Sequence, residues 1–171
     1  MSRYIACVAF VAALAPWPLA LAQITTSVRV GGTVEQPLTL GVEDLKQFAP
    51  RRIEDVRIVE QEGRREERTR RYVGVLLRDV LDRAKPVEKD RLDLRRSAIL
   101  ATASDGYKVV FSWAELYLSP IGDGVLVYYE VDGKPLDHRE GRIALASLKD
   151  TRPGPRHVRW LQSLEVVRVG Q

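Results

Sequence analysis

Residues 141–161 read GRIALASLKDTRPGPRHVRWL and join a short apolar run to a dense group of basic residues. The apolar run at residues 143–148 predicts a strand, and the partial alternation at residues 158–169 predicts a second strand that ends the domain. Guanidinium and backbone N–H groups that meet in one loop favour the binding of a phosphate or another planar anion. Four basic residues surround the Pro-Gly-Pro turn of this loop: Lys149, Arg152, Arg156 and Arg159.

The loop also fits a simpler interpretation, a basic surface loop with Trp160 in the core, because charged side chains are common on protein surfaces. If Arg156 and Arg159 lie on one strand, they point to opposite faces, since they are three residues apart. Only one of the two would then face a given pocket.

The segments upstream of this loop predict further strands, tight turns and a few short helices. The predicted strands are residues 25–30, 98–102, 107–111 and 125–131, with a hairpin at 56–73 around Gly63. The predicted helices are residues 42–48, residues 75–84 and a short helix that starts at a capping box on Ser112. The pattern indicates a single α+β domain with mixed, largely antiparallel sheets.

The predicted hairpin carries a nearly balanced run of charges, with four Glu and five Arg in residues 60–71. We interpret it as a solvated hairpin with weak cross-strand ion pairs. An interaction face is the alternative.

Composition limits the function further. The chain has 171 residues, of which 45% are hydrophobic and 29% charged, and this is the profile of one globular domain. Its formal net charge of +4 is small and spread along the chain, so we expect no nucleic acid partner.

The first residues are typical of a secretory signal peptide. Arg3 precedes an apolar run at residues 5–15, and a small-residue site ends at Ala22. We therefore expect residues 1–22 to be removed and residues 23–171 to form one periplasmic domain. Cys7, the one cysteine, would leave with the signal, which excludes disulfides and thiolate chemistry in the domain.

The remaining residues offer little for hydrolysis. His138 and His157 are the two histidines, they lack the helical spacing of a zinc site, and no serine lies in a nucleophile elbow. We predict no catalytic residues and no metal ligands.

Four motifs resemble those of the sulfite-oxidase-like molybdopterin-binding domains. Residues 141–161 resemble the family's Gly-x-Pro-x-Arg strand, Pro-Gly loop and Val-Lys-Trp-Leu strand. The others are VDGKPL at 131–136, DGY at 105–107 and RRYVGVLLRDVL at 70–81, which are similar to the family's Asn-Gly-x-Pro-Leu turn, Asp-Gly-Tyr hairpin and helix entry. The resemblance implies the sulfite-oxidase-like molybdopterin-binding fold, in which loops at one end of the sheets hold the pterin and phosphate of a molybdenum cofactor.

The resemblance also implies the ligand-binding residues. Arg156 and Arg159 match the family's basic cofactor contacts, and His138 matches a His that in the family directly precedes Gly; here Arg139 and Glu140 intervene. Asp105 is expected to bind the amino-pyrimidine edge of the ring, and Trp113 or Trp160 to stack on it. The full predicted set is Arg71, Ser104, Asp105, Tyr107, His138, Arg156 and Arg159.

The family's enzymes place a cysteine shortly after a strand, but the matching stretch VRIVEQEGRREERTR at 56–70 has none. Because a soft thiolate fixes molybdenum in such enzymes, we expect no thiolate-ligated molybdenum. The resulting hypothesis is a non-catalytic periplasmic domain that binds a pterin or molybdopterin, with a membrane signalling or redox protein as partner. The alternatives are a molybdenum oxidoreductase that holds the metal only through its pterin, and a structural module with a vestigial pocket.

Overall fold

A computed structural model describes residues 25–61, 64–90, 92–152 and 154–170. The predicted signal peptide and Cys7 lie outside these residues. The α-helices are α1 (Val42–Leu45), α2 (Leu77–Ala84) and α3 (Trp113–Tyr117), and short 3-10 helices are η1 (Leu94–Arg96), η2 (Pro120–Gly124) and η3 (Gly154–Arg156). The strands are β1 (Ser27–Gly32), β2 (Leu38–Gly41), β3 (Arg51–Gln61), β4 (Arg64–Leu76), β5 (Ser97–Ala103), β6 (Lys108–Ser112), β7 (Val125–Val131), β8 (Lys134–Pro135), β9 (Ala144–Ser147), β10 (His157–Val158) and β11 (Leu161–Arg168).

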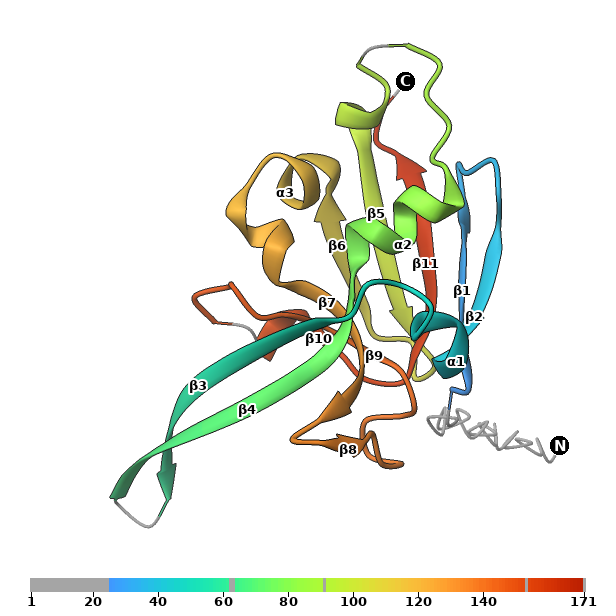
Figure 1. Cartoon of the computed structure of the whole chain (residues 1–171). Coiled ribbons are helices and arrows are strands. Elements are labelled where there is room, and N and C mark those ends of the chain that lie inside the picture. Colours follow the sequence, from blue (N-terminus) through green and yellow to red (C-terminus); the bar gives the residue numbers. More distant parts are fainter. Residues whose placement is uncertain (1–24, 62–63, 91, 153, 171) are drawn as a thin grey trace, which may run out of the picture.

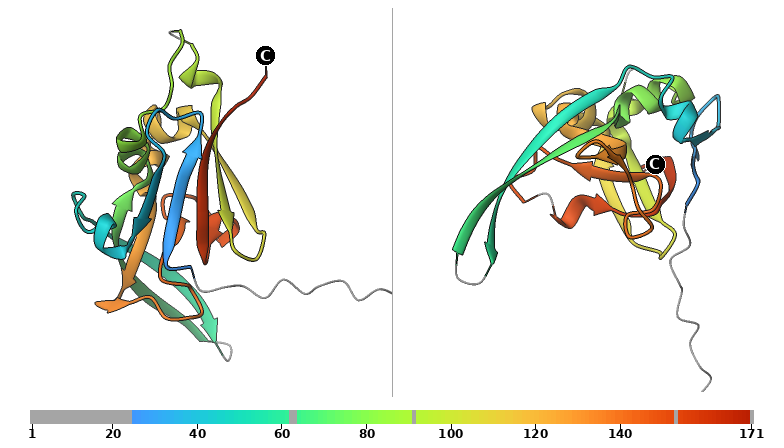
Figure 2. Two further views of the ribbon diagram at one scale, coloured as in Figure 1. Left: turned by 90° about the vertical axis from the view of Figure 1, so that its right-hand side faces the viewer. Right: turned by 60° about the horizontal axis from the view of Figure 1, so that its bottom comes forward.

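The strands form two mixed or antiparallel sheets (Figures 1 and 2). The first sheet has the order β2-β1-β11-β5-β6, in which the β1–β11 pair is parallel. The second has the order β10-β9-β7-β4-β3, with β8 paired to β7, and its pairs are antiparallel. This architecture confirms the predicted α+β class. Within the described residues, no helix is both long enough and apolar enough to cross a membrane.

The two faces of β7 contribute to different hydrophobic clusters. Val125, Val127 and Tyr129 pack into the main core with α2 and the first sheet. Leu126 and Tyr128 point the other way, into a smaller cluster that includes Tyr72 of β4. The centre of the second sheet is therefore buried on both faces, which fits the continuous apolar run of β7.

The second helix is shorter than its periodicity predicts. Val75 and Leu76 belong to β4, where they pair with Val127 and Leu126 of β7. Strand pairing prevails because Gly74 lets the two strands approach closely: a Cβ on Gly74 would lie 2.3 Å from the carbonyl oxygen of Val127. The helix predicted at residues 42–48 is likewise shorter and ends at Leu45.

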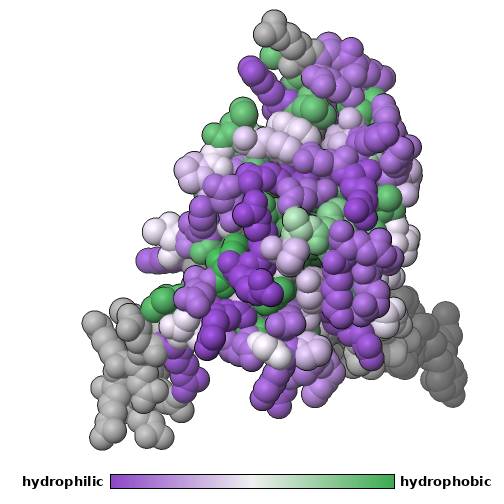
Figure 3. Space-filling model, in the orientation of Figure 1, coloured by the Kyte–Doolittle hydropathy of each residue, from purple (hydrophilic) through white to green (hydrophobic). Residues whose placement is uncertain are grey.

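The predicted hairpin at 56–73 is part of a longer ribbon. Its strands pair from Arg51 opposite Gly74 to Gln61 opposite Arg64. The ribbon projects beyond the rest of the molecule, with β3 at the sheet edge (Figure 1). Hydrophilic residues cover most of the face shown in Figure 3, and hydrophobic residues appear there as small separate areas.

The strand predicted at residues 158–169 is interrupted, and Arg156 and Arg159 do not share a strand, so the condition under which they would point to opposite faces is not met. Arg156 ends η3, and Arg159 lies between β10 and β11. The strand is interrupted because the chain changes sheets here: β10 belongs to the second sheet and β11 to the first. Trp160 makes the crossing with a left-handed backbone, at φ 47°.

Candidate ligand-binding site

Arg156 lies in a half-buried ionic cluster with Asp150 and Glu115, here called the Arg156 cluster. Its Nε donates to Asp150 Oδ2 at 2.6 Å, its Nη2 donates to Asp150 Oδ1, and its Nη1 donates to Glu115 Oε1 at 2.8 Å. The guanidinium also lies 4.8 Å from the centroid of the Phe111 ring. Arg156 therefore ties the basic loop to α3, and two carboxylates already neutralise its charge.

The pKa values in this cluster follow from these contacts. Burial alone would raise the pKa of Asp150, but the hydrogen bonds from Arg156 hold it below its ordinary value. The pKa of Arg156 is raised, chiefly by its hydrogen bond to Asp150. The three groups are therefore ionised together at neutral pH.

The turn between β5 and β6 packs against the same basic loop. Asp105 Oδ1 accepts a hydrogen bond from the backbone N–H of Tyr107 at 2.9 Å, which closes the turn. The Tyr107 hydroxyl donates to the carbonyl of Pro155 at 2.5 Å, and the backbone N–H of Ser104 donates to the carbonyl of Trp160 at 3.0 Å. These predicted site residues thus lie together and hold the turn on the loop.

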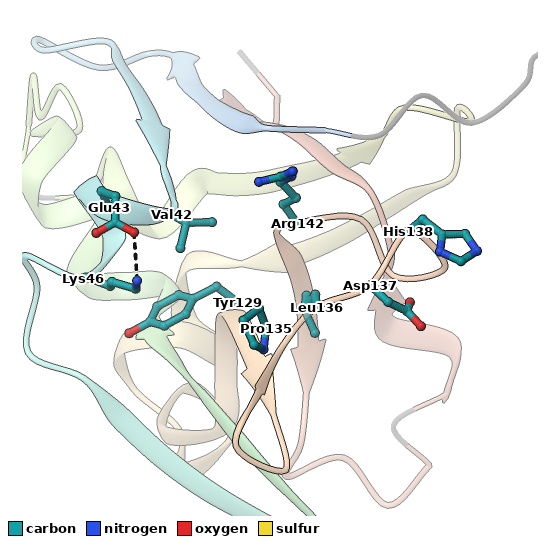
Figure 4. A pocket seen from close by; sticks show the side chains of 9 residues that line it. All are labelled: Val42, Glu43, Lys46, Tyr129, Pro135, Leu136, Asp137, His138 and Arg142. Carbon is teal, nitrogen blue, oxygen red and sulfur yellow. Dashed lines mark hydrogen bonds and ion pairs between the residues drawn. The ribbon is translucent and has the colours of Figure 1, made fainter.

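His138 and Arg71 lie elsewhere. His138 lines a cavity of about 480 Å³ in which Glu43 and Lys46 pair at 2.8 Å near α1, across from Asp137 and His138 (Figure 4). The backbone N–H of Arg71 donates to Asp132 Oδ1 at 2.9 Å, which fixes the turn after β7. A separate cavity of about 430 Å³ is lined by Arg156, so the structure does not bring His138 and Arg156 into one pocket.

Trp160 fixes the segment between His138 and Gly141 instead of packing in the core. Its indole Nε1–H donates to the carbonyl of His138 at 2.9 Å, and its backbone N–H donates to the carbonyl of Glu140 at 2.8 Å. Gly141 has φ 77°, and a Cβ there would lie 2.9 Å from Trp160 Cα. Trp113, the other predicted stacking residue, stacks on Tyr117 with ring centroids 3.9 Å apart.

The fixed segment places Glu140 against Tyr128 and His157, a second group of polar side chains that we call the Glu140 cluster. The Tyr128 hydroxyl donates to Glu140 Oε2 at 2.8 Å and lies 2.6 Å from His157 Nε2. His157 Nε2 is 3.0 Å from the same carboxylate oxygen. Tyr128 also makes an edge contact with Tyr72, with ring centroids 5.1 Å apart.

The Glu140 cluster holds a carboxylate in its charged form. Burial alone would raise the pKa of Glu140, but hydrogen bonds from His157 and Tyr128 and the nearby Arg159 guanidinium lower it to about 2. Burial and the Glu140 charge raise the pKa of the Tyr128 hydroxyl, which therefore remains a donor. Glu140 Oε1 faces Arg159 Nε at 3.8 Å, within ion-pair range but longer than a hydrogen bond.

Glu140 also lines a cavity of about 430 Å³ on this side of the second sheet, a size typical of small-molecule sites. The walls combine apolar, cationic and acidic side chains: Val131, Pro135, Leu136, Arg70, Lys134, Arg139, Asp132, Asp137 and Glu140. A hydrogen bond to Tyr72 raises the pKa of Arg70. Residues 135–137 also line the cavity that holds His138, so they separate two cavities.

The prediction from sequence missed the Glu140 cluster, because Tyr128, Glu140 and His157 come from three separate segments. One signal was present: the resemblance described above implies a His-Gly pair at this point, and Arg139 and Glu140 stand between His138 and Gly141. Of the predicted residues, Arg159 lies beside this cluster. Within the described residues, no group of three or more His, Cys, Asp or Glu side chains could hold a metal ion.

Two comparisons with known proteins show the family and the fold of this chain. The family model of the oxidoreductase molybdopterin-binding domain matches residues 15–170. The chain therefore belongs to this family of molybdopterin-binding domains, as its motifs predicted.

Among solved structures, the chain is similar to the sulfane dehydrogenase SoxCD from Paracoccus pantotrophus. The TM-score is 0.63 at 18% sequence identity, and the match covers 86% of this chain and 40% of that chain. This likeness confirms the predicted sulfite-oxidase-like fold, although the chain spans less than half of the SoxCD chain's length. No curated protein matches the chain.

Proposed function

We propose that this protein binds a pterin-type ligand and does not carry out molybdenum redox chemistry. The proposal rests on one observation: the chain belongs to a molybdopterin-binding family, but its one cysteine, Cys7, precedes the matched domain. The donor set of residues 23–171 contains no thiolate, so it does not fit a molybdenum centre held by the protein through sulfur.

The cavity beside Glu140 suits the organic part of such a ligand. A pterin is a flat ring with donors and acceptors along its edge, and it needs apolar walls and a few fixed polar groups. Val131, Pro135 and Leu136 supply apolar surface, and Glu140 supplies an ionised acceptor. Arg159 does not line this cavity, but its half-exposed guanidinium lies beside Glu140, where it can stack on the ring.

Arg156 has a different role in this proposal. Its guanidinium is already paired with Asp150 and Glu115, so Arg156 stabilises the conformation of the loop that carries His157 and Arg159. Ser104, Asp105 and Tyr107 support the same loop from the β5–β6 turn.

The place of action that we propose is the periplasm, with a membrane signalling or redox protein as partner. The composition of residues 1–22 supports export. Fractionation of cells that express the full chain, or a chain that lacks residues 2–22, tests this proposal. We expect the full chain in the periplasmic fraction and the shortened chain in the cytoplasm; equal distribution of both contradicts export.

Calorimetric titration of the purified protein tests the ligand. We expect binding of reduced pterins or of molybdopterin with a Kd in the micromolar range or below. Elemental analysis of protein purified from its native compartment tests the second half of the proposal. One molybdenum per chain would show instead an oxidoreductase that holds the metal through its pterin, and flat titrations with all these ligands would favour a module with a vestigial pocket.

A further inference from the structure

Glu140 enters the site from the turn that precedes β9. The backbone of this turn is fixed, because Trp160 holds the carbonyls of His138 and Glu140 through two hydrogen bonds. The Glu140 side chain therefore starts from a defined position.

Glu140 has the properties of a preorganised acceptor. Its side chain is only 16% exposed, and Tyr128 and His157 both contact Oε2, which fixes the orientation of the carboxylate. Oε1 points toward Arg159, whose side chain is half-exposed and whose Nε is beyond hydrogen-bonding distance. A carboxylate oxygen has two lone pairs, so Oε1 can accept from two N–H donors that lie side by side.

Asp105, the residue expected from the family motif to bind the ring edge, is placed differently. Its Oδ1 closes the β5–β6 turn through the backbone N–H of Tyr107. The side chain is exposed, and none of the cavities described above is lined by it. Glu140 is half-buried in a cavity wall and is the better placed carboxylate.

We propose that Glu140 recognises the donor edge of the pterin's pyrimidine ring and so selects for the 2-amino group. The exocyclic 2-amino group and the ring N3–H donate to the Glu140 carboxylate, and Arg159 then lies beside the ring. This assignment rests on the proposed function, since it concerns the same cavity. It selects against pteridines that carry a carbonyl at position 2, because that oxygen would face the carboxylate.

A pair of ligands that differ at position 2 tests the assignment. Pterin has the 2-amino group, and lumazine has a carbonyl there. We expect the wild-type protein to bind pterin roughly 100-fold more tightly than lumazine, since a hydrogen bond to a charged group is lost and a repulsive contact is gained. In Glu140→Gln the preference should fall below about tenfold, because the amide can donate to the carbonyl of lumazine.

Glu88→Gln, the same change at an exposed position outside these cavities, is the matched control, and its preference should equal that of the wild-type protein. Glu140→Asp keeps the charge on a shorter side chain and should retain a reduced preference for pterin, which provides a second variant if Glu140→Gln fails to fold. If Glu140→Gln keeps the full preference, or if Glu88→Gln loses it, the assignment is wrong while pterin binding stands. If the wild-type protein binds neither ligand, the proposed function fails as well.

Discussion

The Arg156 cluster and the Glu140 cluster both include residues of the segment 150–157. They differ in how many of their charged groups have a hydrogen-bond partner within the protein. In the Arg156 cluster, one guanidinium meets carboxylates on two sides, at Asp150 and Glu115. In the Glu140 cluster, one carboxylate oxygen takes the contacts of Tyr128 and His157, and the other faces a guanidinium beyond hydrogen-bonding distance. The first cluster is complete within the protein, and the second retains capacity for a ligand.

This difference separates two kinds of basic residue that the sequence does not distinguish: those paired within the protein and those available to a ligand. The sequence predicted Arg156 and Arg159 alike as ligand-binding residues, yet 21% of the Arg156 side chain is exposed against 51% for Arg159. Satisfied charges stabilise the fold, and incompletely satisfied charges at a cavity are the ones that suit binding. Four predictions test this division, in order of decreasing effect.

The largest effect is expected for Arg156→Met. Removal of the guanidinium leaves Asp150 partly buried without its paired cation and Glu115 with only its contacts to Ser112, which should lower the free energy of unfolding by about 4 kcal/mol. Urea denaturation measures the change. Arg152→Met, an exposed position in the same loop, is the control and should change stability by less than about 0.5 kcal/mol. A loss of under about 1 kcal/mol for Arg156→Met would mean that its ion pairs are as weak as surface pairs.

Acid should weaken the Glu140 cluster in a defined pH window. The pKa of Glu140 is about 2 in the folded protein and about 4.5 when it is exposed, so its ionised form stabilises the fold above pH 4.5. This contribution, on the order of 3 kcal/mol, is lost as the pH falls from 4.5 toward 2.

Urea denaturation of the wild-type protein and Glu140→Gln between pH 2 and 6 isolates that contribution, because other carboxylates titrate in both proteins. The difference in stability between the two should shrink as the pH falls. A difference that stays constant with pH would show that Glu140 has an ordinary pKa.

Gly141→Ala should disturb the backbone that carries Glu140. Its φ of 77° is costly for alanine, and the new Cβ would lie 2.9 Å from Trp160 Cα. Gly133→Ala is the control, since Gly133 has φ 76° and open space around the position of a Cβ. We expect Gly141→Ala to be about 2 kcal/mol more destabilising than Gly133→Ala in thermal unfolding. Equal losses would mean that Trp160 moves aside freely.

The smallest effect is expected for Tyr128→Phe. The ring still packs on Tyr72, but the hydroxyl that donates to Glu140 is gone, which should cost about 1 kcal/mol. The pKa of Glu140 should rise at the same time. NMR titration of the Glu140 side-chain carboxyl in both proteins measures this pKa. An unchanged pKa would show that the Tyr128 hydroxyl does not stabilise the Glu140 carboxylate.

Sequence predicted those parts of the fold that depend on local patterns. β7 has the predicted bounds because its apolar run ends at an Asp-Gly turn, and the capping box on Ser112 starts α3 as expected. The break between β10 and β11 was not predicted, since the residues on both sides of Trp160 continue an apolar alternation. The left-handed backbone of Trp160 arises from the crossing between sheets, which is a tertiary feature.

The site was harder to predict, because its contacts join distant segments. Glu115 reaches Arg156 across 41 residues of sequence, so nothing near Arg156 indicated that its guanidinium is occupied. His157 meets Tyr128 only through the pairing of β10 with β9 and of β9 with β7. Arg139 and Glu140 were visible in the sequence as residues between His138 and Gly141, but the side chains that contact Glu140 were not.

The position of Trp160 has a consequence for motion. Between β10 and β11 it carries the chain from one sheet to the other, and it also holds the carbonyls of His138 and Glu140. Separation of the two sheets at this point would strain these hydrogen bonds, which tie the backbone of Glu140 to the crossing. The amide hydrogen of Trp160 should therefore exchange with solvent as slowly as those of the central strands, which makes this loop one of the last parts of the molecule to open.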